Sequence, residues 1–119
     1  GAIANAVAFR DGDPWLADLV PYLEHNRDTL LSLLAEEIPD AWMPKPEGTY
    51  VGWIDFRAIG AGDTPAEFFT REASIVLTEG SLCGVAGTGF ARLIFATPKP
   101  VLEQIVRGLG RSLRSVAAL

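Results

Sequence analysis

The sequence has little of what metal and redox sites are built from. Its 119 residues include one cysteine, one histidine and one methionine. A single cysteine cannot form a disulfide within the chain, and one His with one Cys cannot supply the usual zinc ligand sets. No apolar run reaches the roughly 18 residues that predict a membrane span, and no segment has the pattern of a secretory signal. We therefore expect a cytoplasmic protein with no bound metal and no membrane partner.

Basic side chains are also scarce. The formal net charge is −5. Residues 1–91 carry 5 basic and 14 acidic side chains, a balance of −9, and residues 92–119 carry 5 basic and 1 acidic, a balance of +4. Binding to nucleic acid needs a basic surface that neutralises phosphates. The basic C-terminal stretch is better explained by arginines near the end of a helix, where cations complement the helix dipole, so no nucleic-acid partner is expected.

The remaining composition is typical of a folded protein. Hydrophobic residues make up 49% and charged residues 21% of the chain, close to the averages for globular domains. This length corresponds to one domain that can bury a core without disulfides.

A long helix is predicted near the start of the chain. Asp13 is a good N-cap and Pro14 suits the first helical position. Apolar residues follow at helical spacing to residue 34, with a polar gap at Asn26 and Arg27, and the helix is expected to stop before Pro39. Pro21 should kink or restart it. A helix of about 24 residues spans roughly 36 Å, which is long for a small domain and suits a connection between two domains.

The rest of the chain alternates strands and helices. Strands are predicted at residues 49–56, 74–77 and 90–96, the last two joined by a glycine-rich loop and therefore antiparallel. Thr64, Pro65 and Glu67 form a capping-box pattern that starts a short helix ending near residue 72. A last helix follows Thr97 and Pro98. The fold expected is an α/β sandwich: a small three-stranded, largely antiparallel sheet with helices on one face.

Arg92 is the candidate functional residue. It lies in the otherwise apolar stretch FARLIF, where strand alternation puts Phe90, Arg92 and Ile94 on one face. A charged group there must be paired or must point into a cleft, because burying it unpaired is costly. Its planar fork matches a carboxylate with two parallel hydrogen bonds. From the residues alone, Arg92 binds either a substrate carboxylate or an acidic side chain of this chain.

Other chemistry-bearing residues favour structural roles. His25 is expected to be exposed on the long helix, and Cys83 to be a buried, inert thiol. Lys45 and Lys99 are the only lysines, and neither has the apolar setting that lowers an amine pKa for Schiff-base chemistry. The glycines of residues 80–89 lead into a strand rather than a helix, which disfavours a phosphate site.

Several motifs, in order, resemble one enzyme family. They are residues 12–16 (GDPWL), 22–28 (YLEHNRD), 46–55 (PEGTYVGWID), 68–69 (FF), 87–93 (GTGFARL) and 95–98 (FATP). Together they resemble the C-terminal part of class I/II aminotransferase-type enzymes that use pyridoxal phosphate (PLP), in the branch of the cystathionine β-lyases, or C–S lyases. The resemblance covers nearly the whole chain.

The resemblance implies a fold, a cofactor and a role for one residue. Residues 1–119 would be the small C-terminal domain of PLP fold type I, with the interdomain helix within residues 1–38. The large domain, with the Schiff-base lysine, would lie outside this chain, so the chain alone would be inactive. In the family, the arginine at the position of Arg92 binds the substrate α-carboxylate. The intact enzyme would be a homodimeric lyase or aminotransferase acting on an amino acid, with PLP as the electron sink.

Two points stay open. Family members often have Asn where Ile94 stands and an aromatic residue where Cys83 stands, which leaves the exact substrate undetermined. The alternative from another class is a stand-alone α/β ligand-binding or regulatory module without catalysis. An N-terminal segment covered by its own fold would favour that alternative, whereas exposed apolar residues there would favour a domain that packs on a larger partner.

Overall fold

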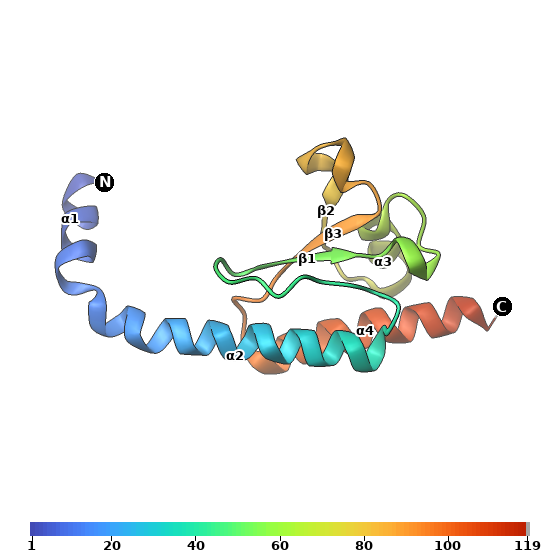
Figure 1. Cartoon of the computed structure of the whole chain (residues 1–119), viewed down its shortest axis with the longest axis horizontal. Helices are drawn as coiled ribbons and strands as arrows, with labels where there is room; N and C mark the ends of the chain where they lie inside the picture. Colours follow the sequence, from blue (N-terminus) through green and yellow to red (C-terminus); the bar gives the residue numbers. More distant parts are fainter. Residues whose placement is uncertain (119) are drawn as a thin grey trace.

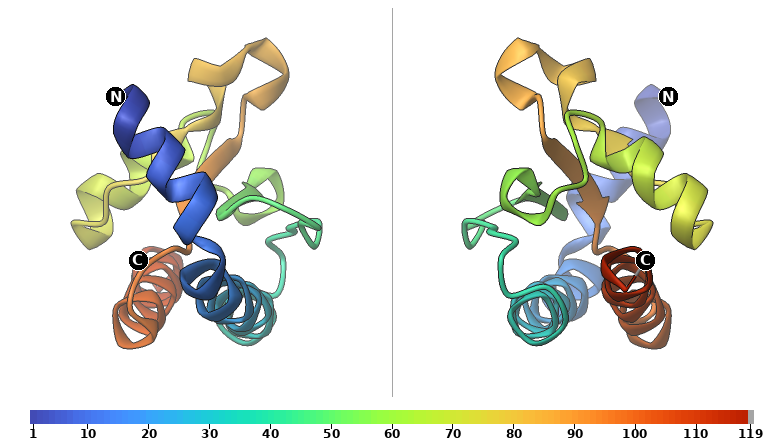
Figure 2. Two further views of the ribbon diagram at one scale, coloured as in Figure 1. Left: turned by 90° about the vertical axis from the view of Figure 1, so that its left-hand side faces the viewer. Right: turned by 90° about the vertical axis from the view of Figure 1, so that its right-hand side faces the viewer.

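The computed structural model describes residues 1–118 and contains four α-helices and a three-stranded sheet. The elements are α1 (Ala2–Asp11), α2 (Asp13–Glu37), β1 (Val51–Asp55), η1 (Arg57–Ile59), α3 (Pro65–Ala73), β2 (Thr78–Glu79), η2 (Gly80–Cys83), η3 (Val85–Gly87), β3 (Phe90–Ile94) and α4 (Lys99–Ala117). Helices α2 and α4 lie side by side beneath one face of the sheet (Figures 1 and 2). The predicted fold class is confirmed.

The sheet is antiparallel throughout, with β3 in the centre and the order β1-β3-β2. Alternate strand residues, such as Ile54 and Leu93, point toward the helices and are almost fully buried. They pack against α2 and α4 through residues such as Leu30 and Val106. Because strand side chains alternate between the two faces, the opposite face of β1 and β3 is left free of helices. This outer face carries Arg92.

The long helix has the predicted position and continues through Pro21 without a restart. Of the two residues in the predicted polar gap, Arg27 is partly exposed, whereas Asn26 is fully buried. The first residues form a separate helix, α1, that bends away from α2 and has no buried residue (Figure 1). The N-terminal part of the chain therefore extends beyond the packed body, and the chain as a whole measures 56 Å along its longest axis.

Two local predictions are wrong. Residues 74–77 are an unpaired extended connection, and the strand is the two-residue β2 that follows. Ile75 and Leu77 pack on the core, so their apolar alternation reflects burial rather than pairing in a sheet. The expected side-chain caps at Asp13 and Thr64 do not form; Gly12 precedes α2, and Glu79 accepts hydrogen bonds from the first amides of α3 instead.

Candidate functional site

Arg92 lies on the helix-free face of the sheet, as the alternation predicts. Its neighbours Ala91 and Leu93 are buried against the helices, whereas Arg92 is half-buried. In the ladder it pairs with Trp53 of β1 on one side and with Thr78 of β2 on the other. The central strand thus holds this guanidinium between two neighbouring strands.

Within residues 1–118, no carboxylate lies within 4.0 Å of the Arg92 guanidinium, although nine such ion pairs form elsewhere. Its one side-chain contact at hydrogen-bond range runs from Nη1 to the Cys83 sulfur, at 3.8 Å. A thiol is a weak acceptor and leaves most donors of the guanidinium available. The ion-pair alternative for Arg92 therefore has no partner in the described part of the chain.

An aromatic pair lines the same face. Trp53 and Phe90 stack with ring centroids 5.6 Å apart and planes 21° from parallel. The Arg57 guanidinium lies 4.8 Å above the Phe90 ring and forms a salt bridge with Asp55, Nη2 to Oδ2 at 2.6 Å. The side-chain hydrogen bonds from Arg57 lower the pKa of Asp55 below its usual value. Of the two arginines on this face, Arg57 is neutralised and Arg92 is not.

The other candidate residues lie away from Arg92, except Cys83. His25 is exposed as predicted, with Nε2 3.4 Å from the Lys99 amine. Lys45 is exposed and pairs with Asp28 at 2.9 Å. Cys83 is exposed rather than buried, because the apolar residues around it belong to two short 3-10 turns on the surface and not to the core.

The described residues do not form a PLP site of their own. A Schiff base needs an uncharged amine, which burial in apolar surroundings favours. Both lysines are exposed and near a carboxylate: Lys45 pairs with Asp28, and Lys99 lies 4.0 Å from Glu103. What this chain offers is a free guanidinium for an anion.

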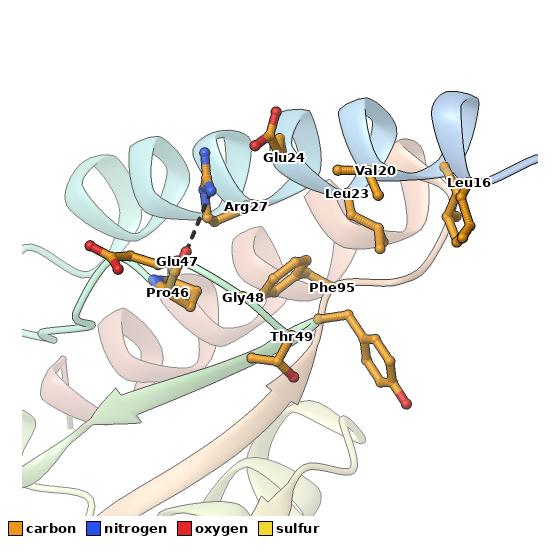
Figure 3. Close-up of a pocket in the computed structure, with 12 residues that line it drawn as sticks. Leu16, Val20, Leu23, Glu24, Arg27, Pro46, Glu47, Gly48, Thr49 and Phe95 are labelled. Atoms are coloured by element: carbon orange, nitrogen blue, oxygen red, sulfur yellow. Dashed lines mark hydrogen bonds between the residues drawn. The ribbon is translucent and has the colours of Figure 1, made fainter. Parts of the chain in front are cut away.

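An apolar groove that the sequence did not predict runs between α2 and the loop before β1 (Figure 3). Its volume is about 300 Å³, and its lining residues are Leu16, Leu19, Val20, Leu23, Glu24, Arg27, Pro46, Glu47, Gly48, Thr49, Tyr50 and Phe95. Arg27 donates a hydrogen bond to the Pro46 carbonyl across it. Arg92 is not among the lining residues, so the groove and the guanidinium are separate features.

Residues 1–118 contain neither a metal-ligand cluster nor a membrane-spanning helix. No group of three or more His, Cys, Asp or Glu side chains is placed to hold a metal ion. No helix in this part of the chain combines the length and hydrophobicity needed to cross a bilayer.

No family model matches the chain, but individual proteins do. A protein of Mycobacterium tuberculosis assigned as a cystathionine β-lyase is 35% identical over 130 residues, which cover 95% of this chain and 32% of that protein. The solved structure of a protein of Corynebacterium diphtheriae, assigned as a PLP-dependent β-cystathionase, superposes with a TM-score of 0.86. It is 37% identical and covers 90% of this chain and 28% of its own.

A third match has the cofactor in its crystal structure. Cystalysin of Treponema denticola, which contains PLP, superposes with a TM-score of 0.85 at 29% identity, over 92% of this chain and 28% of its own. More distant relatives include LL-diaminopimelate aminotransferases. The chain thus spans about 30% of the length of the relatives it matches. Over nearly its whole length the chain is homologous to part of PLP-dependent cystathionine β-lyases and aminotransferases, and its fold is that of their small C-terminal domain.

Proposed function

We propose that this chain is the substrate-carboxylate-binding domain of a PLP-dependent enzyme, a C–S lyase or an aminotransferase. Residues 1–119 would form its small C-terminal domain, and the lysine that binds PLP would lie in a large domain outside this chain. Arg92 would bind the α-carboxylate of the amino-acid substrate. Alone, the chain is expected to be inactive.

The observation that carries the proposal is the unpaired Arg92 guanidinium on an uncovered sheet face. A half-buried arginine with no carboxylate within 4.0 Å among residues 1–118 keeps its charge available for an anion. Its fork geometry suits two parallel hydrogen bonds to one carboxylate. Held by the central strand, the guanidinium fixes the orientation of the bound amino acid, and such positioning raises the rate of the chemical step. PLP, bound elsewhere, supplies the electron sink.

The exposed N-terminal helices support the large-domain part of the proposal. Ile3 and Phe9 of α1 are 83% and 84% exposed, and Trp15 of α2 is 65% exposed. An apolar surface of this kind is typical of an interface with a partner. A stand-alone module would leave it uncovered, so this feature does not favour that alternative. A homodimeric assembly and a cytoplasmic location remain predictions.

The test is substitution of Arg92 in the full-length, PLP-loaded protein. With L-cystathionine as substrate, Arg92→Ala is expected to lower kcat/KM at least tenfold, or about 1.4 kcal/mol. Arg92→Lys keeps the charge but loses the fork, so an intermediate loss is expected. Release of a thiol identifies a lyase, since an aminotransferase releases none.

The matched control is Arg111→Ala, which removes an exposed arginine of α4 and is expected to leave kcat/KM unchanged. Unchanged kinetics in both Arg92 variants would contradict the carboxylate-binding role.

A further inference from the structure

Asp55 is the acidic side chain that shares the outer face of β1 and β3 with Arg92. The ladder pairs Trp53 with Arg92 and Asp55 with Phe90, so Asp55 and Arg92 are diagonal neighbours. Diagonal residues of an antiparallel pair lie about 7–8 Å apart, within reach of long side chains. Asp55 is therefore placed to compete for the guanidinium that would bind a substrate carboxylate.

Arg57 holds the Asp55 carboxylate in another direction. Its Nη2 donates to Oδ2 at 2.6 Å and its Nε to Oδ1 at 2.9 Å. The backbone N–H of Arg57 also donates to Oδ1, at 2.9 Å. Asp55 therefore accepts hydrogen bonds from three donor groups of one residue, and its side chain is only 17% exposed.

The local backbone makes room for this contact. An added Cβ at Gly89, which has a φ of +80°, would lie 2.4 Å from Cγ of Arg57. Glycine at this position thus lets the stem of Arg57 cross the end of β3.

The stacked aromatic pair lies between the two groups. In the four-residue patch of the ladder, Trp53 and Phe90 occupy one diagonal and Asp55 and Arg92 the other. Arg57 lies over Phe90 and so covers this stack from the side of Asp55. The Arg57 guanidinium therefore makes two contacts at once: it pairs with the Asp55 carboxylate and it lies over the Phe90 ring.

We propose that Arg57 is a positioning residue that keeps Asp55 from pairing with Arg92, so that Arg92 stays free for the substrate carboxylate. This inference rests on the proposed function. Without Arg57, a net negative charge stands beside Arg92. That charge opposes an incoming carboxylate in two ways: it repels the carboxylate directly, and it can occupy the guanidinium.

The experiment is a double-mutant cycle in the full-length, PLP-loaded protein. Arg57→Ala is expected to raise the KM for L-cystathionine and the inhibition constant of propionate about threefold or more, with kcat retained. Propionate probes the capture of a carboxylate alone. Asp55→Asn added to Arg57→Ala is expected to restore both constants, because it removes the released charge and keeps an oxygen that can accept the backbone N–H of residue 57.

The control is Arg71→Ala. Like Arg57, Arg71 pairs with a carboxylate close in sequence, that of Glu72, and its guanidinium lies 5.7 Å from the centre of the Phe68 ring. Unlike Arg57, it belongs to α3. It is expected to leave both constants unchanged. Arg57→Gln repeats the test with a polar side chain should the alanine variant fold poorly.

The two proposals fail in distinguishable ways. If Arg92→Lys weakens propionate binding but Arg57→Ala and Arg57→Gln do not, the role of Arg57 is overturned and the proposed function stands. An Arg57 effect that Asp55→Asn does not reverse also overturns it, since a merely structural role would persist in the double variant. If neither Arg92→Ala nor Arg92→Lys weakens propionate binding or changes the kinetics, the proposed function fails, and the role of Arg57 fails with it.

Discussion

Asn26 joins the long helix to the connection between β3 and α4. Its side chain is fully buried, and Nδ2 donates to the carbonyls of Phe95 and Thr97, at 2.9 and 2.8 Å. Both carbonyls belong to residues that follow the end of β3, where the chain is no longer part of the sheet. One amide thus donates to two carbonyls, of which Thr97 also accepts from the Tyr22 hydroxyl, while the Asn26 Oδ1 has no hydrogen-bond partner among the described residues.

Asn26→Ala is expected to lower the free energy of unfolding by about 1–3 kcal/mol, because the buried Phe95 carbonyl loses its donor and the Thr97 carbonyl keeps only the hydroxyl of Tyr22. Denaturant unfolding of the 119-residue chain measures this. His25→Ala, at the adjacent exposed position, serves as control and is expected to change stability by less than about 0.5 kcal/mol. Equal stabilities of the two variants would refute the bridging role of Asn26.

Arg92 and Asn26 differ in how far the sequence reveals them. A charge inside an apolar strand is conspicuous, so Arg92 and the face it occupies could be predicted. Asn26 falls in the apolar phase of the helix, and its neighbour Arg27 made both look like a solvent-exposed gap. Only the packing of the segment after β3, distant in sequence, makes Asn26 necessary. The exposure of Cys83 was mispredicted for a similar reason, since short 3-10 turns carry no periodic signal.

At the scale of elements, the N-terminus of α3 is capped by Glu79, a residue of β2. Oε2 of Glu79, in β2, accepts hydrogen bonds from the amides of Ala66 and Glu67, at 3.0 and 3.3 Å. A carboxylate at a helix N-terminus also interacts favourably with the helix dipole. The contact joins α3 to the edge of the sheet beside Arg92, because Glu79 and Ala91 pair in the ladder.

Glu79→Ala is expected to speed hydrogen exchange of the Ala66 and Glu67 amides and to destabilise the fold by about 1 kcal/mol. Exchange followed by NMR at single residues measures it. The sequence pattern instead assigns the cap to Thr64, whose hydroxyl would accept from the Glu67 amide. Thr64→Ala is therefore the matched comparison and should leave the exchange of the Glu67 amide nearly unchanged. If Thr64→Ala speeds exchange of the Glu67 amide more than Glu79→Ala does, the capping box would be the correct description of this helix start.

The long elements could be predicted from the sequence and the short contacts between them could not. Helices α2 and α4 repeat their apolar spacing over many residues, β1 is rich in β-branched and aromatic residues, and β3 is apolar apart from Arg92. The two-residue β2 has no such pattern, and its position depends on pairing with β3. The Trp53–Phe90 stack and the position of Arg57 over Phe90 depend on the ladder register, which a sequence does not specify at single-residue resolution.

At the scale of the whole molecule, α1 is the least packed of the four α-helices in the described part of the chain. Helix α1 buries no residue, and Figure 1 shows it bent away from the body formed by the sheet, α2 and α4. Its exposed apolar side chains continue onto the first turns of α2, at Trp15, Leu16 and Val20. Burial of such a surface against a larger domain would contribute favourable free energy to closing the two domains together.

The 119-residue chain on its own is therefore expected to bind a dye for apolar surfaces, such as anilinonaphthalene sulfonate, more strongly than the full-length protein does. Ile3→Ser combined with Phe9→Ser should lower the fluorescence of the isolated chain. Val76→Ser is the control, since it removes an equally exposed but isolated apolar side chain. Circular dichroism of each variant checks that the fold is retained. Equal dye binding by the isolated chain and the full-length protein would mean that this surface stays uncovered, and the stand-alone module would then become the better explanation of α1.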